Sequence, residues 1–196
     1  MFISVLIYNW NNEYCMNKLN FLGRGAGYHS KESNTASYIR DNETLLLIDC
    51  GETVFKKILE KNLMDGVKED ESFLALNPDG KRIESLNLEV KSKLTKHVKP
   101  LNTYSYILSF DNANSIFYSG DTYETNIDIM TFLKNGNLVY HDTCLDDVEE
   151  NVHTSLRKLC ELVPKEYRSQ VYCIHIDGDN FVEEANRQGF KIVTID

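Results

Sequence analysis

IFYSGDT, residues 116–122, is an apolar run that ends on a serine, a glycine, an aspartate and a threonine. The apolar residues predict a buried strand, and Ser-Gly-Asp-Thr predicts the turn that ends it. Asp121 could cap that turn, or it could reach into a site as a metal ligand or base. The choice depends on what else in the chain could meet this carboxylate.

The segments around this strand predict strands first and an alternation of strands and helices later. TYSYILSF (103–110) forms a hairpin with 115–122 across DNAN, and helix-like apolar spacing marks 52–64, 125–136, 153–164 and 180–190. Further strands are predicted in the segments 18–23, 37–51 (two strands joined at Asp41-Asn42), 68–98 (short strands with NPDG as a tight turn), 137–144, 170–177 and 191–195. We therefore expect an α/β domain with helices outside two packed sheets.

Length, charge and cysteine content restrict the class of protein. With 196 residues we expect a single domain over 17–196, preceded by an extension over 1–16 that is an edge strand or disordered. The net charge of −9 argues against binding duplex DNA, which requires a basic face. No stretch approaches the roughly 18 apolar residues of a membrane span, so no membrane partner is expected. Five cysteines without a CxxC pair favour a reducing, cytoplasmic location.

Histidines and aspartates gather where the predicted strands end. The residues in question are His97, Asp121, His141, Asp142, His153 and His175. Polar side chains at one rim of a sheet are where α/β proteins place chemistry. Imidazole and carboxylate groups together suit zinc, manganese or iron. Each residue also has a simpler interpretation as a turn, surface or satisfied core residue, and spacing alone does not establish that they converge.

The order of motifs resembles the metallo-β-lactamase fold, an αββα sandwich. The segments FLGRGAGYHSKESNTASYI, LLLIDCGE, TKHVKPLNTYSYIL, IFYSGDT, LVYHDTC, NVHTSLRKL and VYCIHID carry the resemblance, from about Leu19 to the C-terminus. The branch they resemble most is that of tRNase Z and the cyclic-nucleotide phosphodiesterases, including phage anti-Pycsar enzymes. These enzymes bind a phosphodiester across two metals.

The resemblance implies a role for several residues. His97 would bind one metal, Asp121 would bridge two metals, and His175 would bind the second. Asp49, in LLLIDCGE, would support the metal site from beneath. The loop from Gly23 to Thr35 would line the rim, with Asn34 near the ligand.

Two further residues match the general-acid part of the family site. His153 corresponds to a histidine near the scissile phosphate, and Asp142 to an acidic residue that orients it. His141 has no counterpart in the family, so we leave it out of the site.

The defining motif of this fold, HxHxDH, is absent because the sequence contains no HxH pair. We expect the segment that carries it to be lost, which truncates the sandwich. His97, Asp121 and His175 could hold one zinc or manganese ion at most, or none. The loss of a strand and helix would also expose apolar surface, which a homodimer or the segment SFLALNP could cover.

Three functions remain open. The first is a phosphodiesterase relative with a degenerate metal centre that binds a nucleotide, or another phosphate-containing small molecule, with little or no turnover. The second is an active metal-dependent phosphodiesterase or hydrolase, acting on a cyclic nucleotide or RNA. Its replacement ligands would come from His29, Glu69, Asp70 or a partner subunit. The third is a non-catalytic interaction module in which the retained residues are relics.

Overall fold

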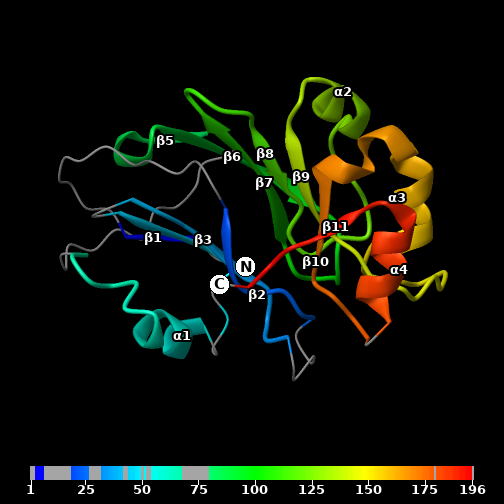
Figure 1. Ribbon diagram of the computed structural model, residues 1–196, viewed down its shortest axis with the longest axis horizontal. Helices are drawn as coiled ribbons and strands as arrows, with labels where there is room; N and C mark the ends of the chain where they lie inside the picture. Colours follow the sequence, from blue (N-terminus) through cyan, green and yellow to red (C-terminus); the bar gives the residue numbers. More distant parts are fainter. Residues whose placement is uncertain are drawn as a thin grey trace.

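The protein folds into two sheets that face each other, with helices on the outside of both (Figure 1). The computed structural model describes residues 3–6, 19–26, 32–41, 44–49, 51, 54–67, 80–178 and 180–195. Three segments discussed above lie outside these ranges: His29, the pair Glu69 and Asp70, and SFLALNP (72–78).

The first sheet has the strand order β1-β4-β3-β2, and every neighbouring pair is antiparallel. Its strands are β1 (Ile3–Leu6), β2 (Asn20–Gly23), β3 (Ala36–Arg40) and β4 (Leu45–Ile48). The amide of Asp41 donates to the carbonyl of Thr44 over 3.0 Å, which closes the predicted turn between β3 and β4. β1 belongs to the predicted extension and lies at an edge of the sheet, while the domain boundary at residue 16 stays a prediction.

The second sheet has the strand order β11-β10-β9-β8-β7-β6-β5. Its strands are β5 (Lys81–Ile83), β6 (Leu88–Thr95), β7 (Thr103–Phe110), β8 (Ile116–Tyr118), β9 (Leu138–Asp142), β10 (Val171–Ile174) and β11 (Lys191–Ile192). The strands from β5 to β8 form an antiparallel meander, and those from β8 to β11 are parallel. This division confirms the predicted change from meander to strand–helix alternation.

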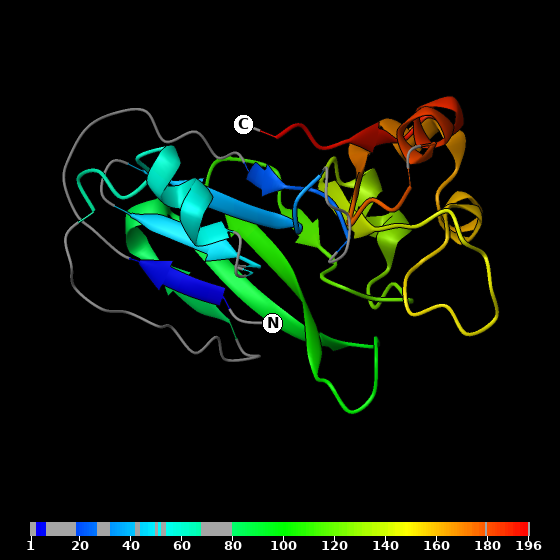
Figure 2. The same cartoon turned by 90° about the horizontal axis from the view of Figure 1, so that it is seen from below.

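Helix α1 (Val54–Glu60) covers the outer face of the first sheet. Helices α2 (Ile129–Lys134), α3 (Leu156–Leu162) and α4 (Phe181–Gln188) cover the outer face of the parallel part of the second sheet (Figures 1 and 2). Short 3-10 helices span Glu84–Leu86 and Lys165–Gln170. Among the described residues, no helix is long and apolar enough to cross a membrane.

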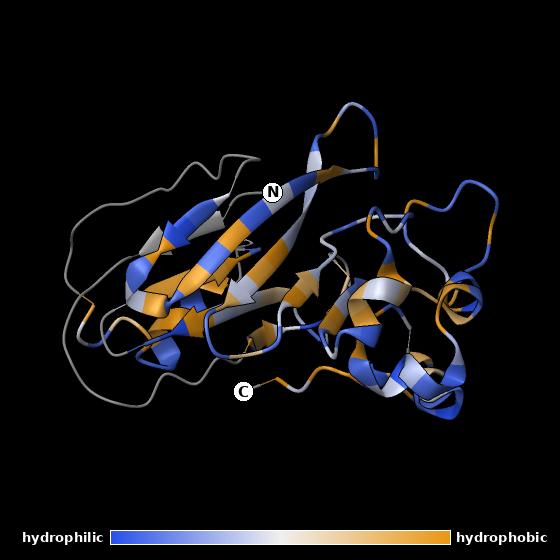
Figure 3. Ribbon diagram, turned by 90° about the horizontal axis from the view of Figure 1, so that it is seen from above, coloured by the Kyte–Doolittle hydropathy of each residue, from blue (hydrophilic) through white to orange (hydrophobic). Residues whose placement is uncertain are grey.

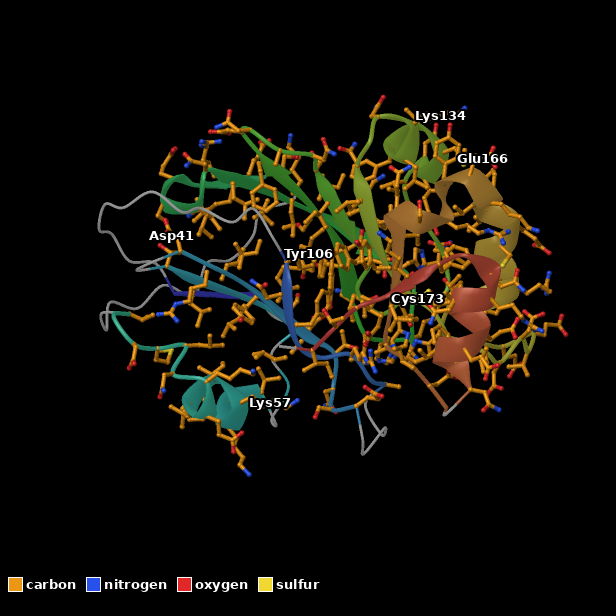
Figure 4. The ribbon with its side chains drawn as sticks, in the orientation of Figure 1. Asp41, Lys57, Tyr106, Lys134, Glu166 and Cys173 are labelled. Atoms are coloured by element: carbon orange, nitrogen blue, oxygen red, sulfur yellow. The ribbon has the colours of Figure 1, made fainter. Side chains whose placement is uncertain are left out.

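Alternation of side chains along the strands divides the core into layers. Tyr118 and Tyr106 pack between the two sheets, whereas Phe117 and Cys173 face the helices. Figure 4 shows Tyr106 between the sheets and Cys173 near α4. In β6, hydrophobic and hydrophilic residues alternate along most of the strand (Figure 3), and Leu88 and Val90 pack into the core between the sheets.

One predicted helix begins later than expected. The helix predicted to open at His153 begins at Leu156, because the hydroxyl of Ser155 caps it by accepting from the amide of Lys158. His153 therefore lies in the loop before the helix.

Candidate metal and phosphate site

The ends of four strands bring charged side chains to one place between the sheets. Asp49 follows β4 directly, Asp121 follows β8 by three residues, Asp142 ends β9 and His175 follows β10. Because β8, β9 and β10 are parallel, their carboxyl ends meet at the same edge of the sheet. The predicted site residues on these strands therefore converge.

Three strand ends in this region have left-handed backbone conformations. The φ angle is +58° at Asp49, +60° at Gly120 and +60° at His175. A non-glycine residue rarely adopts such a φ, although aspartate and histidine do so more readily than most. Strained backbone concentrates at functional sites, so Asp49 and His175 fit a site that requires particular side-chain directions.

Asp142 and His153 form a hydrogen-bonded pair. The Nδ1 atom of His153 lies 2.7 Å from Oδ2 of Asp142, which is completely buried. The same oxygen accepts from the amide of Thr122 over 2.7 Å. Since a carboxylate accepts, the ring donates through Nδ1 and its Nε2 is left for other partners. The hydrogen bond holds the His153 ring against Asp142, and the orienting role that the resemblance implied stays a prediction.

Several neighbouring groups act on the pKa of His153. Burial lowers it, but the hydrogen bond from the ring to Asp142 and the charges of Asp142, Asp121 and Asp177 outweigh burial. The net effect is a pKa raised above the usual value for histidine. The protonated form of the ring is suited to donate a proton to a leaving group.

His175 lies between two carboxylates. Its Nε2 is 3.5 Å from Oδ1 of Asp121, and its Nδ1 is 3.5 Å from Oδ1 of Asp142. The ring centre of His175 is 4.5 Å from that of His153. Asp121 thus belongs to the cluster of charged side chains, which answers the question that its place behind Gly120 raised.

His97 lies at the border of the same cluster. Its ring centre is 5.0 Å from that of His153, and its Nδ1 is 2.9 Å from the carbonyl oxygen of Val152. A carbonyl oxygen only accepts, so Nδ1 carries the hydrogen and Nε2 keeps a lone pair for a ligand. Metal-binding histidines typically donate their other ring N–H to a carbonyl or carboxylate in this way.

Asp49 is hydrogen-bonded to Tyr118, which the sequence did not predict to be part of the site. The hydroxyl of Tyr118 donates to Oδ2 of Asp49 over 2.7 Å, and Tyr118 is completely buried. The alternation in IFY, which turns Tyr118 and Phe117 to opposite faces of β8, was the signal that could have placed it.

The two remaining candidates differ in their surroundings. His141 is completely buried; its Nε2 lies 2.7 Å from the hydroxyl of Thr125 and its Nδ1 2.8 Å from the carbonyl of Asp142. It is a satisfied core residue. Gly25 forms one isolated β-bridge with Asn34 and another with Ile176, the residue that follows His175. Asn34 therefore lies at the rim, in the loop that was expected to line it.

Three of these residues could hold one metal ion. Ligand atoms of Asp142, His153 and His175 all lie within 4.8 Å of one another. Oδ1 of Asp142 is buried and has no hydrogen-bond partner within the described part of the chain. An unsatisfied buried carboxylate oxygen fits a bound cation, since leaving it unpaired costs free energy. The group shares only His175 with the predicted set of His97, Asp121 and His175.

The charge of the site favours a cation. Asp49, Asp121 and Asp142 are close enough for their charges to influence one another. Such a group of carboxylates repels an anionic phosphate unless a metal ion or protonated histidines neutralise it. A phosphate-binding function thus requires a positive charge at this place.

Comparison with known proteins identifies the fold and a family. Residues 69–194 match the sequence profile of a family described as "Anti-Pycsar protein Apyc1". The metallo-β-lactamase fold protein YhfI from Bacillus subtilis has a TM-score of 0.61 at 11% identity, over 91% of this chain and 95% of that one. A diphosphatase of the PhnP family has a TM-score of 0.65 at 14% identity, over 90% and 94%. No match was found among curated proteins.

These similarities bear out the predicted αββα sandwich and the predicted branch. At 11% and 14% identity the two structures establish the fold alone. The family profile covers well over half of the chain. It includes five of the seven predicted site residues, His97, Asp121, Asp142, His153 and His175, whereas Asn34 and Asp49 precede it.

Proposed function

Because this chain belongs to the anti-Pycsar protein Apyc1 family, we propose that it is a phosphodiesterase relative that binds a nucleotide or another phosphate-containing small molecule with little or no turnover. The observation that carries the proposal is the 2.7 Å hydrogen bond between buried Asp142 and His153. A polarised imidazole of this kind can donate a hydrogen bond or a proton to a phosphate oxygen.

The metal centre is degenerate in this proposal because the HxHxDH motif is absent from the sequence. His153 and Asp142 can bind and protonate a phosphodiester, but neither residue generates a nucleophile. A single divalent cation, such as zinc or manganese, would supply charge neutralisation and acidify a water molecule when bound. Asp142, His153 and His175 are the residues that would hold it. With the cation bound, His153 would serve as a ligand through Nε2 and would not donate a proton.

A second candidate is an active metal-dependent phosphodiesterase. The observation in its favour is the group of three ligands around the unsatisfied Oδ1 of Asp142. Three protein ligands with an open fourth position are the usual arrangement of a catalytic zinc. Hydrolysis of a phosphodiester substrate distinguishes this active enzyme from the relative with a degenerate metal centre.

Two further proposals concern the cellular location and the oligomeric state of the protein. Cys144, Cys160 and Cys173 are free thiols, which supports a reducing, cytoplasmic location. Phe55 and Leu59 lie one turn apart on α1 and are 62% and 54% exposed, which supports a homodimer that covers them. Light scattering of the purified protein tests the oligomeric state.

Titration of the protein with a 3′,5′-cyclic nucleotide, with and without Mn²⁺, tests the function. Wild type, His153→Ala and Asp142→Asn are compared with Asp111→Asn, which removes a carboxylate that pairs with Arg82 on the surface. We expect Mn²⁺-dependent binding that weakens at least about tenfold in the two site variants and not in the control. Binding equal in all four proteins, or none in any, would leave an interaction module as the remaining function.

Hydrolysis of bis(p-nitrophenyl) phosphate in the same samples separates the two candidates. Negligible turnover with intact binding supports the degenerate centre. Turnover that requires Mn²⁺ and disappears in Asp142→Asn supports the active enzyme.

A further inference from the structure

We propose that Thr35 is a positioning residue for His175. The glycine-rich segment, whose described parts are residues 23–26 and 32–35, thereby fixes a site residue that follows β10 of the second sheet. This inference rests on the proposed function, because His175 is part of the proposed site. It concerns a contact between residues 140 positions apart in the sequence.

The backbone of His175 requires support in its conformation. With φ at +60°, directly after β10, it occupies a left-handed region that is unfavourable for a non-glycine residue. The left-handed conformation of His175 turns the chain away from β10. The amide of His175 therefore needs an acceptor outside the sheet.

The hydroxyl of Thr35 provides that acceptor. The amide of His175 donates to Oγ1 of Thr35 over 3.1 Å, and this hydroxyl donates in turn to the carbonyl of Gly25 over 3.1 Å. Thr35 is 8% exposed, so water does not readily replace either bond. The hydroxyl is thus used both as donor and as acceptor.

The surrounding backbone holds Thr35 against the second sheet. Ile176 donates to the carbonyl of Arg24 over 2.7 Å and accepts from the amide of Ala26 over 3.0 Å. The amide of Thr35 donates to the carbonyl of Gly25 over 2.9 Å. These bonds extend from the first sheet to the residue that follows His175, so the glycine-rich segment and the end of β10 form one unit.

The close approach depends on the absence of a side chain at Gly23. A Cβ atom there would lie 2.1 Å from the carbonyl oxygen of Asn34, which is far inside contact distance. Glycine at this position allows the two arms of the segment to approach each other, and Thr35 follows directly after Asn34.

The position of the His175 ring follows from this backbone. Both ring nitrogens lie 3.5 Å from carboxylate oxygens, one of Asp121 and one of Asp142. A change of φ at His175 would rotate the Cα–Cβ bond and move the ring away from both. The hydroxyl of Thr35 acts on the site only through His175.

Replacing the hydroxyl tests the inference. Thr35→Val keeps the shape of the side chain, removes the acceptor of the His175 amide and removes one of the two hydrogen bonds to the Gly25 carbonyl, whereas Thr35→Ser keeps the hydroxyl. Thr44→Val is the matched control, because buried Thr44 donates to Ser85 over 2.8 Å, in a contact between the start of β4 and the 3-10 helix that follows β5. Thr44 precedes β4 and lies at the opposite end of that strand from Asp49.

Two measurements on the full chain are made for each protein. Mn²⁺ affinity is expected to fall about tenfold in Thr35→Val, and to stay within about twofold of wild type in Thr35→Ser and Thr44→Val. Histidine ring signals in NMR spectra without metal are expected to shift for His175 in Thr35→Val alone. His175→Gln assigns that signal. Thr35→Ala replaces Thr35→Val if the latter does not fold.

The results distinguish this inference from the proposed function. If wild type binds no Mn²⁺, the metal site is overturned, while the His175 signal still reports on Thr35. If the signal of His175 and the Mn²⁺ affinity in Thr35→Val equal those in Thr44→Val, Thr35 has no positioning role. If Thr35→Ser behaves like Thr35→Val, the hydroxyl is not the group that acts.

Discussion

Tyr118 donates the hydrogen of its hydroxyl group to Asp49, with 2.7 Å between the two oxygens. The pKa of Asp49 is raised to about 7, mainly by burial and further by the charges of Asp121 and Asp142, while the bond from Tyr118 opposes the rise. The folded protein therefore holds a proton on Asp49 that the unfolded chain releases near pH 4.

The first prediction concerns pH and stability. Because the folded-state pKa of Asp49 lies above the unfolded value, its contribution is fully present below about pH 4 and is lost as pH rises through about 7. We expect the free energy of unfolding of the metal-free protein to fall by roughly 4 kcal/mol over this range, at about 1.4 kcal/mol per pKa unit. Urea denaturation at several pH values measures it.

Asp49→Asn provides the control for this effect. The amide cannot ionise, so the pH dependence of stability should shrink by that amount. An unchanged pH profile in Asp49→Asn would show that other groups cause the dependence.

Removal of the buried carboxylate at position 142 should destabilise the fold. Asp142→Ala leaves the amide of Thr122 and Nδ1 of His153 without their acceptor. An unsatisfied buried donor costs about 1–3 kcal/mol, so we expect a loss of roughly 2–5 kcal/mol in the free energy of unfolding. Asp142→Asn should lose less, because its side-chain oxygen still accepts. Equal losses in the two variants would contradict this account.

Arg168 should be equally sensitive to substitution, far from the site. It is 6% exposed and donates to three carbonyl oxygens, those of Val163, Gln188 and Cys160. Arg168→Met preserves much of the volume but removes all three bonds, and we expect a loss of about 3 kcal/mol. Thermal unfolding with Arg187→Met, on the surface of α4, as control measures it; similar melting temperatures would refute the prediction.

Metal affinity separates two possible ligand sets. The structure groups Asp142, His153 and His175, whereas the sequence suggested His97, Asp121 and His175. We expect His153→Ala to weaken Mn²⁺ binding more than tenfold and His97→Ala to weaken it by less, since a lost ligand costs more than a lost neighbour. Equilibrium dialysis gives both constants. The opposite order would favour the set that the sequence suggested.

The sequence predicted most of the second sheet because apolar runs there are long and bounded by turn residues. The segment 116–122 gave β8 and the turn after it, and 137–144 gave β9. The family resemblance of these segments also indicated that Asp121 and His175 share a site. In the structure, Nε2 of His175 lies 3.5 Å from Oδ1 of Asp121.

The grouping of ligands could not be predicted from the sequence. Spacing locates the end of a strand, but the direction of a side chain there depends on backbone angles such as the φ of +60° at His175. The contacts of His175 with Thr35, and of Asp49 with Tyr118, join residues 140 and 69 positions apart. No local pattern in the chain encodes such pairs.

The contact between Thr35 and His175 has a consequence for the order of folding during synthesis on the ribosome. At about 5–20 residues per second, translation of the 140 residues between them takes roughly 7–28 s. Through that interval the first sheet can emerge and pair its strands, but the partner that completes its glycine-rich segment has not been synthesised. The histidine cluster therefore cannot assemble before residue 175 has been synthesised, and a shorter nascent chain cannot bind the ligand at this site.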